Sequence, residues 1–188
     1  MIFKCFHVCN DIGTREEIKK NAPFKSTGKN KWLGEGCYFW TDSDHWAKMW
    51  NNKSYKGKGV IIKYKIKIEK DKLLDLVGNV NQQINFYRDW YKICMKLGKK
   101  INNISNYIMF LREAQAHTPG AFGYWGVRAK DANPNVKCID FIEKTNEDDA
   151  VPYSSFYERH QLCVYEEFKS SCVVFEKFTY PDKFCYVK

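Results

Sequence analysis

Residues 59–68, with the sequence GVIIKYKIKI, alternate between apolar and basic side chains from Ile62 onward. Because successive side chains of a β-strand point to opposite faces, this alternation predicts a strand with two unlike faces. The apolar face carries Ile62, Tyr64, Ile66 and Ile68, and the basic face carries Lys63, Lys65 and Lys67. A strand of this kind belongs to a sheet that is covered on one side and exposed on the other.

Shorter runs of β-branched and aromatic residues, ended by turn-forming residues, predict further strands. They cover residues 2–8, 37–40, 136–142, 161–166, 171–178 and 184–187. A capping box of Thr14 and Glu17 predicts a short helix, and Thr41 with Asp44 predicts the start of another.

Residues 79–97 and 101–117 show the spacing of three to four positions between apolar residues that is typical of amphipathic helices. In the first segment this face carries Ile84, Tyr87, Tyr91 and Cys94. We interpret the two segments as a helical pair inserted at about residues 79–118. The ends of the chain are rich in strands and the middle is helical, so we expect an α+β fold with one domain over residues 1–188.

Eight cysteines would suit a disulfide framework in a secreted chain, but the N-terminal sequence MIFKCFHVCND has no apolar run long enough for a signal peptide. No segment approaches the length of a membrane span. We therefore expect a cytoplasmic protein with reduced thiols. Cys5, His7 and Cys9 share one face of a strand, but the chain has no CxxC pair of the kind that structural zinc sites use, so we predict no metal.

The net charge of +9 is concentrated in the first half of the chain. Residues 1–100 hold 21 of the 31 basic and 10 of the 22 acidic side chains, which leaves 10 basic and 12 acidic residues for the second half. A basic region favours a nucleic-acid partner, although a solvated lysine face is the common alternative. The candidate contact residues lie near Tyr55 and Tyr64 and are Lys53, Lys56, Lys58, Lys63, Lys65 and Lys67.

Three segments that lie far apart in the sequence place polar or aromatic side chains on predicted strands. The first is FHV, with His7, the second is LGEGCYFWTDSDHWAKMW, with Tyr38, and the third is HQLCVY, with Gln161. A pocket that cleaves the bond between nicotinamide and ribose needs an aromatic surface, hydrogen bonds to the carboxamide and groups that stabilise an oxocarbenium-like ribose. Imidazole, phenol and amide groups would supply part of this set if the three strands converge.

In this order and at these separations, the three segments resemble the ADP-ribosyltransferase superfamily, in the His-Tyr-Glu branch that includes the poly(ADP-ribose) polymerases and many small bacterial and phage proteins. The second segment is similar to the family motif G-x-G-x-Y-F, and the third to E-Y-I-V-Y. The resemblance covers the first fifty residues and roughly the last thirty. It implies a split antiparallel β-sheet core that carries the inserted helical pair, and NAD as the substrate that donates ADP-ribose.

By this resemblance, His7 hydrogen-bonds the ribose next to the nicotinamide, and the backbone of Val8, where the family usually has glycine, holds the carboxamide. Tyr38 would stack on the nicotinamide ring. Trp46 and Trp50 lie one helical turn apart, so one of them could wall the pocket, although such a pair is more often core. A buried strand histidine that is satisfied by its neighbours is the alternative interpretation of His7.

Gln161 departs from the family pattern, whose third residue is usually a glutamate that favours the cationic transition state. An amide donates and accepts hydrogen bonds but brings no charge. Glu158 lies three residues earlier, where a loop that enters the strand could swing it into the pocket, and we expect it to act as the acid. A solvated loop charge is the alternative role for Glu158.

The chain also resembles small bacterial toxins of toxin–antitoxin and phage-defence systems, which makes RNA or single-stranded DNA the expected acceptor and an antitoxin protein a candidate partner. Two other functions stay open: a module that binds NAD, ADP-ribose or RNA with weak catalysis, and a transferase that acts on protein. An RNA-processing nuclease with His7 or His160 as general base is weaker, because the chain lacks a recognisable set of paired histidine and lysine residues.

Overall fold

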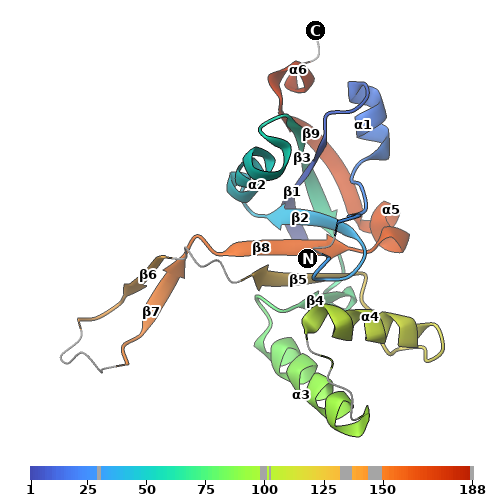
Figure 1. The fold of residues 1–188 in the computed structure, drawn as a ribbon, viewed down its shortest axis with the longest axis vertical. Coiled ribbons are helices and arrows are strands. Elements are labelled where there is room, and N and C mark those ends of the chain that lie inside the picture. The colour runs from blue at the N-terminus through green and yellow to red at the C-terminus, as the bar shows by residue number, and fades with distance from the viewer. Residues whose placement is uncertain (29–30, 98–100, 102, 132–136, 144–149, 187–188) are drawn as a thin grey trace.

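The computed structural model describes residues 1–28, 31–97, 101, 103–131, 137–143 and 150–186 (Figure 1). Within these residues the fold is α+β, as predicted, with one mixed sheet of seven strands, one sheet of two strands and six α-helices. In spatial order the seven strands are β4 (Leu73–Asp75), β5 (Gly126–Asp131), β8 (Arg159–Val164), β2 (Cys37–Thr41), β1 (Ile2–Asn10), β3 (Gly59–Lys67) and β9 (Val173–Tyr180). The two-stranded sheet consists of β6 (Lys137–Asp140) and β7 (Tyr153–Phe156).

The helices are α1 (Arg15–Asn21), α2 (His45–Tyr55), α3 (Val80–Leu97), α4 (Ile104–Gln115), α5 (Lys169–Cys172) and α6 (Asp182–Cys185), with the 3₁₀ turns η1 (Lys70–Lys72) and η2 (Glu166–Phe168).

The predicted capping box of α1 is confirmed, because Thr14 and Glu17 each accept from the other's backbone N–H. The predicted strand at 184–187 is wrong, since residues 182–185 form α6. The seven-stranded sheet is mixed: β4 and β5 pair in parallel, whereas its other strand pairs are antiparallel, as the sequence analysis expects for the sheet core.

The strand β3 has the two faces that its sequence predicts. Its apolar side chains are buried and form one core with Ile18 of α1, Cys172 of α5 and Phe184 of α6. On the opposite face of the sheet, α2 packs through Ala47 against side chains of β1, β2 and β3. On the basic face of β3, Lys65 and Lys67 are exposed.

The sheet is weakly joined between β1 and β2, and this feature positions the site. β1 pairs with β3 at nine positions, from Ile2 to Asn10. With β2 it pairs only at Cys5 with Thr41 and at Phe6 with Trp40. The two strands therefore separate after Phe6, and a gap opens on one side of β1.

The helical pair predicted at about residues 79–118 corresponds to α3 and α4, which lie beyond the β4 edge of the sheet (Figure 1). The hairpin of β6 and β7 extends away from the body of the molecule. In the described residues, no helix has both the length and the apolar character needed to cross a membrane.

Candidate functional site

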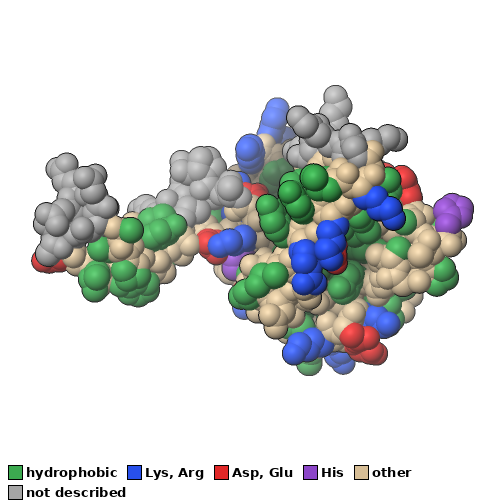
Figure 2. All heavy atoms as spheres, turned by 90° about the horizontal axis from the view of Figure 1, so that it is seen from below, with side chains coloured by type: hydrophobic (Ala, Val, Ile, Leu, Met, Phe, Trp, Pro, Cys, Tyr) green, Lys and Arg blue, Asp and Glu red, His purple; other side chains and the backbone are tan. Residues whose placement is uncertain are grey.

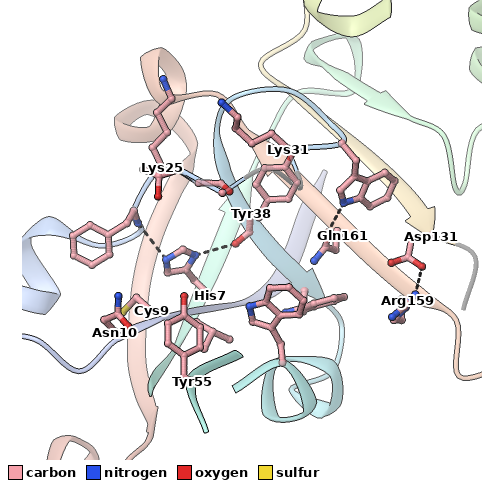
Figure 3. A pocket seen from close by; sticks show the side chains of 18 of the residues that line it. His7, Cys9, Asn10, Lys25, Lys31, Tyr38, Tyr55, Asp131, Arg159 and Gln161 are labelled. Atoms are coloured by element: carbon pink, nitrogen blue, oxygen red, sulfur yellow. Dashed lines mark hydrogen bonds and ion pairs between the residues drawn. The ribbon is translucent and has the colours of Figure 1, made fainter. Parts of the chain in front are cut away.

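The three segments singled out in the sequence meet at one pocket of about 1680 Å³ (Figure 3). His7 of β1, Tyr38 of β2 and Gln161 of β8 all line it. The loop between α1 and β2 forms one wall, Trp50 of α2 contributes to another, and residues 103–106 lie at the start of α4. Pockets for single small ligands usually measure about 300–1,000 Å³. This pocket therefore has room for a nucleotide and for part of a second molecule.

His7 is 6 % exposed, and both of its ring nitrogens have protein partners. Nδ1 lies 2.9 Å from the carbonyl oxygen of Tyr38, and the N–H of Phe24 donates to Nε2 at 3.2 Å. Because a carbonyl only accepts and an amide N–H only donates, the ring is neutral with its proton on Nδ1. Burial lowers the pKa of His7 to about 4. A ligand that bonds Nε2 must therefore replace the amide of Phe24.

The contact between His7 and Tyr38 lies where β1 and β2 separate. The carbonyl of Lys4 accepts from the N–H of Asp42, so the even-numbered residues of β1 direct their backbone groups toward β2. If the pairing of β1 with β2 continued beyond Phe6 and Trp40, the next hydrogen bonds would join Val8 to Tyr38. The carbonyl of Tyr38 binds the ring of His7 instead. The N–H and C=O of Val8 consequently face the gap, and Val8 lines the pocket.

Tyr38 is held by the glycine-rich loop that precedes its strand. Its hydroxyl accepts from the N–H of Leu33 and donates to the carbonyl of Gly34, both at 2.8 Å. Gly34 has φ of +89°, a conformation that side chains other than glycine rarely adopt. Burial raises the pKa of Tyr38, so the phenol stays protonated and keeps both bonds. The loop sequence and Tyr38 thus form one structural unit.

Gln161 lies on β8 between Trp40 of β2 and Ala129 of β5 in the sheet register. Its Oε1 accepts from the indole N–H of Trp32 at 2.9 Å. Among the described residues, no group bonds its amide nitrogen, and Figure 3 shows the side chain at the pocket. Gln161 can therefore donate to a ligand oxygen, but it adds no negative charge.

Sequence reasoning missed Asp131 of β5 and Arg159 of β8, which form an ion pair in the pocket lining. Arg159 precedes Gln161 by two positions, so both side chains point to the same face of β8. Asp131 lies directly across from Arg159 in the register, a relation that no local sequence pattern reveals. In the described part of the lining, the acids are Asp131 and Glu17, and Glu17 belongs to the α1 capping box. Asp131 is thus the pocket carboxylate on the Gln161 side.

Glu158, the residue expected to act as the acid, does not line the pocket. Its Oε1 accepts from Lys130 at 2.8 Å and from Ser155 at 2.6 Å, and its Oε2 lies 3.1 Å from His160 Nε2. These hydrogen bonds, that of Lys130 above all, lower the pKa of Glu158 to about 2. Alternate residues of a strand point to the same face, so Glu158 lies on the face of His160 and Gln161 points to the opposite face. The structure therefore corrects the expectation that Glu158 enters the pocket.

The two tryptophans of α2 have different surroundings. Trp50 lines the pocket and is 37 % exposed. Trp46 packs against the core under α2 and donates its indole N–H to the carbonyl of Glu158 at 3.0 Å. Only one tryptophan of the pair therefore walls the pocket.

None of the six lysines predicted to contact nucleic acid lines the pocket. Lys63 and Lys65 share one glutamate of β9, at 2.6 and 3.5 Å, which offsets part of their charge. The lysines that do line the pocket are Lys25 and Lys31, and both bond Glu35, at 2.7 and 2.5 Å. They lie in a loop without a regular charge pattern, so sequence reasoning did not find them.

The described residues contain no group of three or more His, Cys, Asp or Glu side chains that could hold a metal ion. Cys5 and Cys9 are buried, and burial raises the pKa of both thiols, that of Cys9 to about 12. Compared with known proteins, the chain matches no family model, no curated protein and no solved structure.

Proposed function

We propose that the chain is an NAD-dependent ADP-ribosyltransferase that binds the nicotinamide end of NAD in the gap between β1 and β2. The observation that carries the proposal is the backbone of Val8, whose N–H and C=O face this gap beside Tyr38. A primary carboxamide has one carbonyl acceptor and N–H donors, so it complements the N–H and C=O of one extended residue. The aromatic ring of Tyr38 offers the surface on which nicotinamide would stack.

In the proposed reaction, the bond between the nicotinamide nitrogen and C1′ of the ribose breaks, and nicotinamide leaves with the bonding electrons. A nucleophile of the acceptor adds to C1′ and gives up its proton to a base or to water. Positive charge develops on the ribose during this step, so a nearby carboxylate stabilises the transition state. We assign this role to Asp131 in place of Glu158, and we assign to Gln161 a hydrogen bond to a ribose hydroxyl.

In the proposed complex, Nε2 of His7 accepts a hydrogen bond from a ribose hydroxyl after the Phe24 amide has moved away. The neutral tautomer with its proton on Nδ1 leaves Nε2 as the acceptor that this contact needs. The same proton holds the ring to Tyr38 and thereby keeps β1 and β2 apart.

As the acceptor we propose nucleic acid, either RNA or single-stranded DNA. The chain has a net charge of +9, and the pocket volume exceeds what one nucleotide fills. Trp50 and Tyr55 both line the pocket, where an aromatic ring could stack on an unpaired base. Lys25 and Lys31 lie on the same lining for contacts with phosphate.

The test is nicotinamide release from NAD in separate reactions with RNA, single-stranded DNA and protein, with labelled NAD to show which pool is modified. Two variants form a matched pair, since each removes the charge of a carboxylate that forms an ion pair with a basic side chain. Asp131→Asn should slow release by about 100-fold. Glu158→Gln, outside the pocket, should change it little. Absence of release by the wild-type chain with every pool would overturn the proposal.

The second candidate is a module that binds NAD or ADP-ribose without efficient catalysis. Gln161 in place of an acid, and the pairing of Asp131 with Arg159, favour it because both reduce the negative charge in the pocket. Tight binding of NAD by calorimetry without nicotinamide release would support this candidate. A nuclease that uses His160 as its base finds no support in the geometry, because His160 lies outside the pocket and pairs with Glu158.

A further inference from the structure

The outer face of α3 carries a continuous apolar stripe that no described element covers. Its residues are between 54 and 69 % exposed, and they are Val80, Ile84, Tyr87, Tyr91 and Met95. No residue of this 18-residue helix is buried. Figure 2, which views the molecule from the end that holds α3 and α4, shows hydrophobic side chains exposed among Lys and Arg side chains. The sequence predicted that Ile84, Tyr87 and Tyr91 share one apolar face of a helix, and in the structure this face is exposed.

The helix is fixed in orientation by its inner face. Gln82 accepts from the N–H of Asp75 at 2.7 Å and donates to the carbonyl of Leu73 at 2.9 Å, so it attaches α3 to β4. Phe86 packs against a tyrosine of α4, with ring centroids 5.0 Å apart, and the indole N–H of Trp90 donates to the carbonyl of Ile101 at 3.0 Å. Because these contacts occupy one side of the helix, the opposite stripe stays exposed.

The spacing of the stripe is that of a helix that packs against another helix. Val80, Ile84, Tyr87 and Tyr91 of the stripe, followed by the half-buried Cys94, are spaced at steps of four, three, four and three residues. This is the heptad spacing of a two-helix seam, in which each side chain inserts between residues of a facing helix. We infer that α3 of a second copy of this chain packs along this stripe, in an antiparallel and two-fold symmetric contact.

The exposed area is sufficient for such a contact. A tyrosine buries about 150–250 Å² when it is fully covered, so Tyr87 and Tyr91, at 62 and 54 % exposure, leave roughly 100 Å² each. The five residues of the stripe together leave on the order of 500 Å² per copy. A symmetric pair then buries about 1,000 Å², the size at which specific interfaces begin.

The charges of α3 decide between the two orientations. Residues 80–87 carry no charged side chain, whereas Arg88, Asp89, Lys92 and Lys96 lie in the second half of the helix. A parallel pair would place Lys92 and Lys96 of one copy beside the same lysines of the other. An antiparallel pair places them opposite the uncharged first half, which avoids this repulsion.

The first test is the mass of the purified chain in solution, measured by sedimentation velocity over a range of concentrations. We expect a dimer of twice the 22.3 kDa of one chain. Ile84→Glu should raise the dimer dissociation constant by at least about 100-fold, because it places a charge in the seam. Ile139→Glu is the matched control, since Ile139 is 61 % exposed on β6 and Ile84 is 56 % exposed on α3.

A wild-type chain that stays monomeric at every concentration would overturn the inference, and so would a dimer that Ile139→Glu dissociates and Ile84→Glu does not. A second measurement tests the orientation. In a Cys138→Ser background, which removes an exposed thiol, Val80→Cys should form a disulfide with Cys94 of the other copy under mild oxidation. Disulfides only between the two Cys94 residues would overturn the antiparallel arrangement. None of these readouts depends on the proposed activity.

Discussion

The buried neutral ring of His7 predicts a loss of stability in the weakly acidic range. Burial lowers the pKa of His7 from 6.5 to about 4 in the folded protein, whereas the unfolded chain keeps the ordinary value. Between these two values the unfolded state binds a proton that the folded state does not bind, so the free energy of unfolding rises with pH. A pKa shift of this size changes the free energy of unfolding by about 3 kcal/mol. This contribution is fully present above the unfolded pKa and is lost as the pH falls toward 4.

The perturbation is His7→Gln, which keeps a donor for the Tyr38 carbonyl but removes the titration. Between pH 7 and about pH 4.5, we expect the wild-type chain to lose about 2.5 kcal/mol more than the variant. Urea unfolding followed by tryptophan fluorescence at the two pH values measures both losses, provided that the m-values agree. Glu35 and Glu158 have pKa values of about 2 in the folded protein, and their contribution to the pH dependence is the same in both proteins.

Equal losses in the two proteins would refute this reasoning, and so would an NMR titration in which the His7 ring is protonated near its ordinary pKa. Either result would mean that water reaches the ring in the folded state. The proposed contact of Nε2 with a ribose hydroxyl would then lose its basis, because a protonated Nε2 donates and cannot accept.

Two further predictions concern Gln161 of the pocket lining and Gly36 in the loop before β2. Gln161→Glu should raise the initial rate of nicotinamide release at least about tenfold by adding the missing charge; an unchanged rate at unchanged NAD affinity would contradict our assignment. Gly36→Ala should lower the free energy of unfolding by about 1–3 kcal/mol, because its Cβ would lie 2.6 Å from the carbonyl oxygen of Val164. Gly28→Ala, in open space, is the control, and equal urea midpoints for both variants would contradict the clash.

The elements that the sequence predicts well are those with strong local signals. The alternation in residues 59–68 gives β3 and its buried face, and the reciprocal pair of Thr14 and Glu17 gives the start of α1. Both signals depend on residues a few positions apart. The segment 184–187 was predicted as a strand from its aromatic residues, but Pro181 precedes a short helix there, α6, whose Phe184 joins the core.

Features that depend on distant residues could not be predicted in this way. The spacing of Ile84, Tyr87 and Tyr91 shows that α3 has an apolar face, but periodicity does not say what covers that face. Glu158 was expected in the pocket because it is close to Gln161 in sequence. The carboxylate on the correct face is Asp131, which is 30 positions earlier in the sequence and enters the site through the pairing of β5 with β8.

The separation of β1 from β2 connects the main features of the site. If the two strands stayed paired beyond Phe6, the Tyr38 carbonyl would bind Val8 and the ring of His7 would lose its partner for Nδ1. The tautomer of His7, the direction of the Val8 backbone groups toward the gap and the position of Tyr38 therefore depend on one another. A change that restores the ladder should close the pocket to nicotinamide even if every side chain of the three segments is kept. The site is thus defined by the broken pairing of two strands, and the three side chains alone do not specify it.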